Sequence, residues 1–100
     1  MPNGDKILDP DTPVAASEEE LLSRIVTRPG VLGGKPIIRG YRIAVEHILG
    51  YYSAGWTEQE ILDSFPFLER DDLLACFCYA ARELSGEYFD PVEESVAGTR

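Results

Sequence analysis

The sequence has little of what enzyme catalysis usually needs. It holds one histidine, His47, and two cysteines, Cys76 and Cys78, in 100 residues. His47 has no partner at the spacing of a metal site, so we expect it at the surface or partly packed. On a helix the two cysteine side chains would point about 200° apart, which suits neither a disulfide nor a zinc knuckle. We expect two small hydrophobic side chains, at least one of them buried, and no catalytic activity, metal or cofactor.

Long apolar runs are also absent. The longest are a few residues, far short of the roughly 20 needed to span a bilayer, and the segment 1–6 lacks the apolar stretch of a signal peptide. We therefore expect no membrane segment and a cytoplasmic protein. The hydrophobic content of 44%, with one Trp, five Tyr and four Phe, is enough to fill the core of one domain.

The charge is strongly negative but unevenly distributed. The formal net charge is −9, yet five of the nine basic residues lie within residues 24–43, which contain no Asp or Glu. An acidic protein can bind a phosphate backbone only where its positive residues are gathered. The segment is therefore a candidate anion-binding surface. The alternative is a solvated hairpin whose arginines maintain solubility.

The first half of the chain predicts short elements. Residues 1–16 contain three Pro, one Gly and three Asp with little apolar periodicity, and we expect a disordered arm. The stretch Ser17-Glu18-Glu19-Glu20 matches a capping box and predicts one or two helical turns. The β-branched run Ile25-Val26-Thr27 predicts a strand. Residues 33–43 predict a small hairpin, in which Gly40 supplies the positive φ of a tight turn.

After residue 44 the apolar spacing becomes that of helices. It predicts three helices over about 45–54, 58–65 and 70–85, the last with an apolar stripe of Leu73, Phe77, Ala81 and Leu84. The lengths and tight connections are typical of a helix-turn-helix domain, and also of many unrelated small bundles. The fold class is therefore mainly α, with a β-hairpin over about 25–43 preceding the three helices.

One long motif indicates a family. It is Gly33-Gly34-Lys35-Pro36-Ile37-Ile38-Arg39-Gly40-Tyr41-Arg42-Ile43, followed by Gly55-Trp56-Thr57 and Tyr79-Ala80-Ala81. Over residues 24–82 the chain resembles the antitoxin-like, prokaryotic family named domain of unknown function 433. Two positions depart from the family pattern, because Tyr41 stands where Thr is usual and Ala44 where Pro is usual. The resemblance implies one domain over 17–86 with a homeodomain-like three-helix fold preceded by a small sheet.

The resemblance also implies a function. Members are often encoded beside a nuclease-like toxin of the PIN type, so we expect an antitoxin-like component of a type II pair that binds a PIN-like toxin and its own operator DNA. The short hairpin edges and the symmetry of operators favour a homodimer. The alternatives are a protein-interaction module that does not bind DNA and a small enzyme with a carboxylate metal site. Acidic residues stand where a recognition helix would meet the major groove, namely Glu69, Asp71 and Asp72. They argue against DNA binding, since base edges are recognised best by Arg, Lys, Asn and Gln. Glu69 is also a poor N-cap for the third helix.

The candidate nucleic-acid-binding residues are Lys35, Arg39, Arg42 and Arg28. Arg39 and Arg42 are expected to flank the hairpin turn, one on each strand, so that both guanidinium groups project near the tip with Lys35 close behind. There they can bind a phosphate or a carboxylate. Alternatively, Arg39 pairs internally with a helix acid such as Glu46.

The tail over residues 87–100 is acidic and aromatic, and lies outside the motif. Tyr88 and Phe89 are its candidate partner-binding residues, on the hypothesis that the tail docks on a basic partner and becomes ordered on binding. The alternative is that both rings fold back on the third helix.

Overall fold

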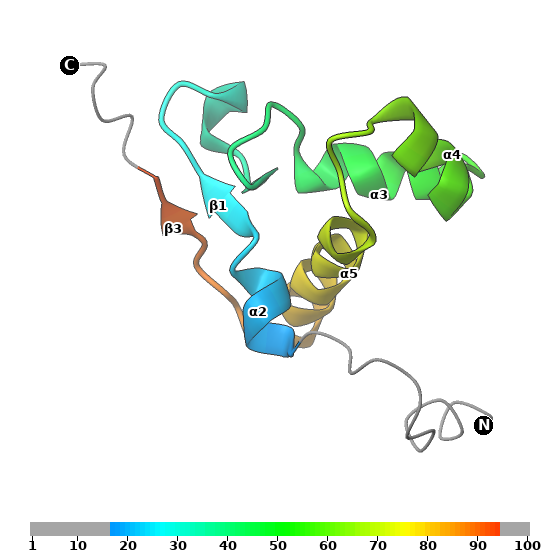
Figure 1. Ribbon diagram of the computed structural model, residues 1–100. Coiled ribbons are helices and arrows are strands. Elements are labelled where there is room, and N and C mark those ends of the chain that lie inside the picture. The colour runs from blue at the N-terminus through cyan, green and yellow to red at the C-terminus, as the bar shows by residue number, and fades with distance from the viewer. Residues whose placement is uncertain (1–16, 95–100) are drawn as a thin grey trace.

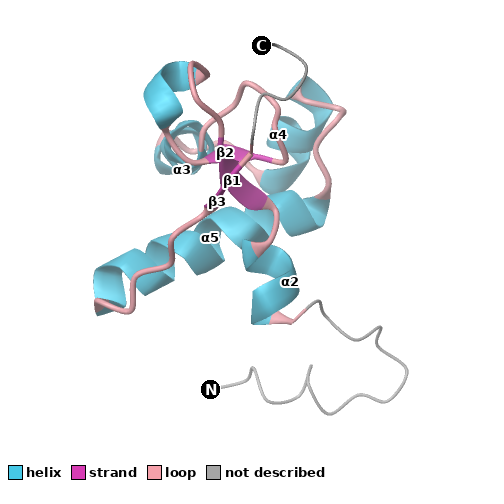
Figure 2. Cartoon of the chain, turned by 90° about the vertical axis from the view of Figure 1, so that its left-hand side faces the viewer, coloured by secondary structure: helices cyan, strands magenta, loops and turns pink. Residues whose placement is uncertain are grey.

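The computed structural model describes residues 17–94 (Figures 1 and 2). The arm predicted over 1–16 and residues 95–100 of the tail lie outside these residues. Within them are the helices α2 (Glu18–Leu22), α3 (Val45–Ser53), α4 (Glu58–Ser64) and α5 (Arg70–Ser85), the strands β1 (Ile25–Thr27), β2 (Ile37–Ile38) and β3 (Val92–Glu93), and a 3₁₀ turn, η1 (Leu32–Gly34). The three helices predicted after residue 44 are confirmed, each to within one residue at its end.

Local hydrogen bonds explain where the helices begin. The capping box predicted at Ser17 forms, and a second one forms at Thr57. Each of these two side chains accepts an N–H from the third helical residue, and the glutamate at that position accepts the N–H of the cap residue in return. At α3 the Nδ1 of His47 accepts the N–H of Ala44 at 3.0 Å. The exposed His47 thus helps to start a helix, and its predicted place at the surface is confirmed.

The sheet has the order β2-β1-β3. β1 pairs antiparallel with β2 and parallel with β3, so Val26 lies opposite both Ile37 and Val92. The predicted hairpin is smaller than expected, with one bridge, Ile37 to Ala44, beyond β2. Placing the whole tail outside the domain was wrong, because β3 adds to the sheet. Its partner β1 is far away in the sequence, and local periodicity carries no signal for such a pairing.

The main core lies where β1, β2 and the helices meet. Its fully buried members include Ile25, Ile38, Ile48, Ile61 and Leu73. α2 packs against α5, and Figure 2 shows the C-terminal half of α5 extending past the other helices. The apolar stripe predicted for this helix is therefore wrong in its second half. Phe77 is 44% exposed and Leu84 is 89% exposed, because the helix turns Leu73, Ala75 and Cys76 to the core instead.

The turn after β2 depends on Gly40. Both Arg39 and Gly40 have positive φ, +48° and +85°. A Cβ on Gly40 would lie 2.8 Å from Nη2 of Arg28 and 3.2 Å from Oε1 of Glu94, two groups that form an ion pair. The predicted positive φ at Gly40 is thus confirmed, and the site also tolerates no side chain without displacing this pair.

We expect Gly40→Ala to lower the free energy of unfolding by about 1.5 kcal/mol, as the strained φ costs about 1 kcal/mol and the displaced ion pair a few tenths more. Gly34→Ala is the matched control, because Gly34 has φ +79° but no atom within 4 Å of its Cβ position. Urea denaturation measures both. Equal losses would contradict the proposed contact with Arg28.

Candidate functional site

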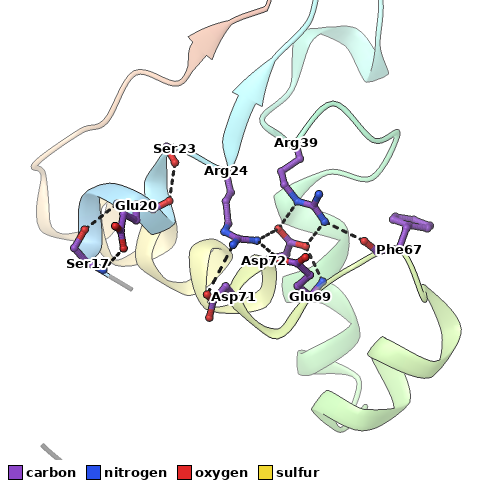
Figure 3. Close-up of polar contacts among 9 residues, drawn as sticks. All are labelled: Ser17, Glu20, Ser23, Arg24, Arg39, Phe67, Glu69, Asp71 and Asp72. Atoms are coloured by element: carbon purple, nitrogen blue, oxygen red, sulfur yellow. Dashed lines mark hydrogen bonds and ion pairs between the residues drawn. The ribbon is translucent and has the colours of Figure 1, made fainter. Parts of the chain in front are cut away.

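The most buried polar side chain of the described residues is Asp72, in the first turn of α5 (Figure 3). Its carboxylate accepts hydrogen bonds from Nε and Nη2 of Arg39, both at 2.8 Å, and from Nη1 of Arg24 at 2.9 Å. It also accepts the N–H of Glu69 at 2.7 Å. This bond caps the N-terminus of α5, where the Glu69 side chain makes no capping hydrogen bond. Asp72 therefore joins the start of β1, the turn after β2 and α5 at one point.

Hydrogen bonding keeps this carboxylate charged. Burial raises the pKa of Asp72, but the hydrogen bonds from Arg39, the Glu69 amide and Arg24 together outweigh burial and lower it below its usual value. The same hydrogen bond to Asp72 raises the pKa of Arg39. Both partners are ionised at neutral pH, so the cluster is a charged network in which each oxygen of Asp72 is paired.

Arg39 does not project from the hairpin tip as predicted. It lies within the turn, and its guanidinium points at Asp72 (Figure 3). The alternative of an internal ion pair is confirmed, although the acid is Asp72 and not Glu46. The Arg39 Nη2 also donates to the carbonyl of Phe67 at 3.0 Å, and its Cζ lies 5.0 Å from the centre of the Tyr41 ring. The prediction assumed that side chains alternate between the two faces of a strand. The positive φ of Arg39 breaks this alternation and turns its side chain toward α5.

The other predicted cations are mostly paired as well. Lys35 binds Glu46 at 3.0 Å, and Arg28 binds Glu94 at 2.8 Å. Arg42 is exposed and has no ion pair within residues 17–94. The expected cationic turn is therefore reduced to a single unpaired arginine, since carboxylates neutralise the rest locally.

The tail residues Tyr88 and Phe89 have different environments. Phe89 packs against the main core, and its ring centre lies 6.3 Å from that of Tyr79 on α5. Tyr88 is 71% exposed. For Phe89 the alternative of folding back on the third helix is confirmed, and only Tyr88 keeps the exposure that docking on a partner requires.

An apolar groove of about 470 Å³ lies between α3, α5 and the segment before β2. Its apolar lining is Pro36, Val45, Leu49, Tyr79, Ala80 and Leu84, and Lys35, Glu46 and Glu83 complete it. The sequence analysis missed this groove, because it combines stripes from two helices that come together only in the fold. One signal for the groove was available in the sequence: Leu84 is an apolar residue in the last turn of a long helix, where the core of a small domain leaves it exposed.

The two cysteines of α5 lie in different environments. Burial raises the pKa of the Cys76 thiol to about 12, which keeps it protonated and unreactive. Cys76 is buried and Cys78 half-buried, as predicted for small hydrophobic side chains. Within residues 17–94 no three His, Cys, Asp or Glu side chains come together in a group that could hold a metal ion.

None of the helices between residues 17 and 94 combines the length and the apolar character that crossing a membrane requires. This agrees with the short apolar runs of the sequence.

Comparison with known proteins places the chain in a family. The family described as "Protein of unknown function (DUF433)" matches residues 25–80. A relative in Sinorhizobium fredii, "Uncharacterized protein y4eO", is 29% identical over 56 residues, which are 56% of this chain and 25% of that protein. The chain thus spans about a quarter of this curated relative. The crystal structure of a DUF433 member from Anabaena variabilis matches with a TM-score of 0.56 and 33% identity, over 69% of this chain and 66% of that one. The chain belongs to the DUF433 family.

Proposed function

We propose that this chain is an antitoxin-like protein of a type II toxin–antitoxin pair, which binds a PIN-type toxin encoded beside it. The observation that supports this proposal is the apolar groove between α3 and α5, which ends at the 89% exposed Leu84. An exposed apolar groove is a surface in which a partner protein can place the apolar face of a helix. The family resemblance supplies the identity of the partner.

The described surface favours a protein partner over operator DNA. Arg28, Lys35 and Arg39 each hold an ion pair, so a phosphate would have to displace a carboxylate at each. In a homeodomain-like arrangement α3, α4 and α5 would be the three helices, and the N-terminal turn of α5 would enter the major groove. That turn carries Asp71 and the buried Asp72, which are unsuited to base edges.

Co-expression with the product of the adjoining reading frame tests the proposal. We expect the two chains to co-purify and to elute together in size-exclusion chromatography with light scattering, which also reports whether this chain is a dimer. A parallel titration with upstream DNA is expected to show no salt-dependent binding. If the adjoining product is a PIN-type nuclease and the two chains elute separately at micromolar concentration, the proposal is wrong.

A further inference from the structure

We infer that the groove between α3 and α5 binds an amphipathic helix of the partner, with apolar side chains in the groove and a Lys or Arg beside Glu83 at its rim. The identification of the partner as a toxin rests on the proposed function. The recognition chemistry rests on the groove alone.

The walls of the groove come from two helices. One wall carries Val45 and Leu49, four residues apart on α3, and the other carries Tyr79 and Ala80 with Leu84 one turn later on α5. Residues at this spacing form the ridges of a helix surface, and a third helix packs its own ridges between two such rows. Apolar side chains of the occupant would then fill the volume of about 470 Å³.

The charge of the rim selects a basic occupant. Glu46 is already bound to Lys35, at 3.0 Å, whereas Glu83 makes no ion pair with any residue of the described range 17–94. Burial raises the pKa of Tyr79 in the groove wall, and the nearby charges of Glu83 and Asp90 raise it further.

Charge also decides against a second copy of the chain as the occupant. The chain carries a net charge of −9, and two copies would repel each other. A partner segment that places Lys or Arg beside its apolar face matches the rim instead.

A fluorescent peptide provides the probe. It contains only Leu and Lys, arranged as an amphipathic helix of about 18 residues, or five turns. A second peptide has Glu in place of every Lys. Fluorescence anisotropy is expected to show binding of the Lys peptide and none of the Glu peptide. Absence of binding by the Lys peptide, or equal binding of both, would overturn the inference.

Two variants locate the binding. Leu84→Asp is expected to weaken binding of the Lys peptide at least about tenfold, because the substitution replaces an apolar contact of the peptide with a charge that must lose water on binding. Glu83→Gln is expected to weaken binding of the Lys peptide by about threefold and to reduce the dependence of this binding on salt.

Val92→Asp is the matched control, since Val92 is 68% exposed and lies outside the groove lining. This variant should bind the Lys peptide like the unchanged chain. Equal losses in Leu84→Asp and Val92→Asp would contradict the inference. Urea denaturation confirms that the variants fold.

The same variants separate this inference from the proposed function. If the adjoining PIN-type product binds the unchanged chain and Leu84→Asp equally, the function stands and the groove is not its binding site. If that product does not bind while the peptide results hold, the function fails and the groove still recognises a basic helix. A dimer that Leu84→Asp dissociates would show that a second copy occupies the groove, against the inference.

Discussion

Asp72→Asn is expected to lower the free energy of unfolding by about 3 kcal/mol, the largest single effect we predict. The substitution keeps the shape of the side chain and an oxygen for the Glu69 amide, but it removes the charge that two guanidinium groups share. Arg24 and Arg39 would then be held together without their common anion. Urea denaturation followed by circular dichroism measures the loss.

Asp71→Asn is the control for this prediction. Asp71 is the neighbouring residue, but its side chain is 40% exposed and lies 3.8 Å from Arg24. Ion pairs this open contribute little, and we expect a loss below about 1 kcal/mol. Similar losses for the two variants would show that the buried network does not stabilise the fold as described.

The pH dependence of stability, measured for the unchanged chain and for Asp72→Asn, tests whether the charge of Asp72 stabilises the fold. The pKa of Asp72 is lower in the folded chain than its usual value near 3.9. A lowered folded pKa contributes stability that is fully present above the unfolded pKa and is lost as the pH falls through the folded one. The stability difference between the unchanged chain and Asp72→Asn should therefore be constant from about pH 7 to pH 5 and shrink below about pH 4. A difference that grows at acid pH would contradict this linkage.

Phe89→Ala is expected to lower the free energy of unfolding by about 2 kcal/mol. Phe89 packs on the main core and beside Tyr79, and removal of a half-buried phenyl ring costs less than the roughly 3–5 kcal/mol of a fully buried one. The same loss should weaken the attachment of β3, which follows it. Thermal and urea denaturation of the variant measure the effect.

Tyr88→Ala is the matched neighbour. Tyr88 is 71% exposed, and its removal is expected to cost less than about 0.5 kcal/mol. The pair also distinguishes the two roles considered for the tail. If Tyr88→Ala lowered the free energy of unfolding strongly and Phe89→Ala did not, Phe89 and not Tyr88 would be the ring available to a partner.

The local sequence determined the helices, β1 and the turn after β2. Capping boxes at Ser17 and Thr57, the β-branched run Ile25–Thr27 and the helical apolar spacing after residue 44 were sufficient to place the helices and β1. Gly40 was sufficient to place the turn after β2. These signals act between residues at most four positions apart, and for that reason they can be read without the fold.

Only the tertiary structure decided which charged side chains pair and which apolar side chains stay exposed. Arg39 was expected at an exposed hairpin tip, yet the fold brings it and Asp72, which is 33 residues away in the sequence, into one part-buried ion pair. β3 and the groove likewise combine distant segments. Such contacts depend on which faces meet when the chain collapses, and no local spacing specifies which carboxylate an arginine will reach. Thus the sequence determined a small bundle with a sheet, while the packing decided that Arg24 and Arg39 bind the buried Asp72 and that an apolar groove between α3 and α5 stays exposed.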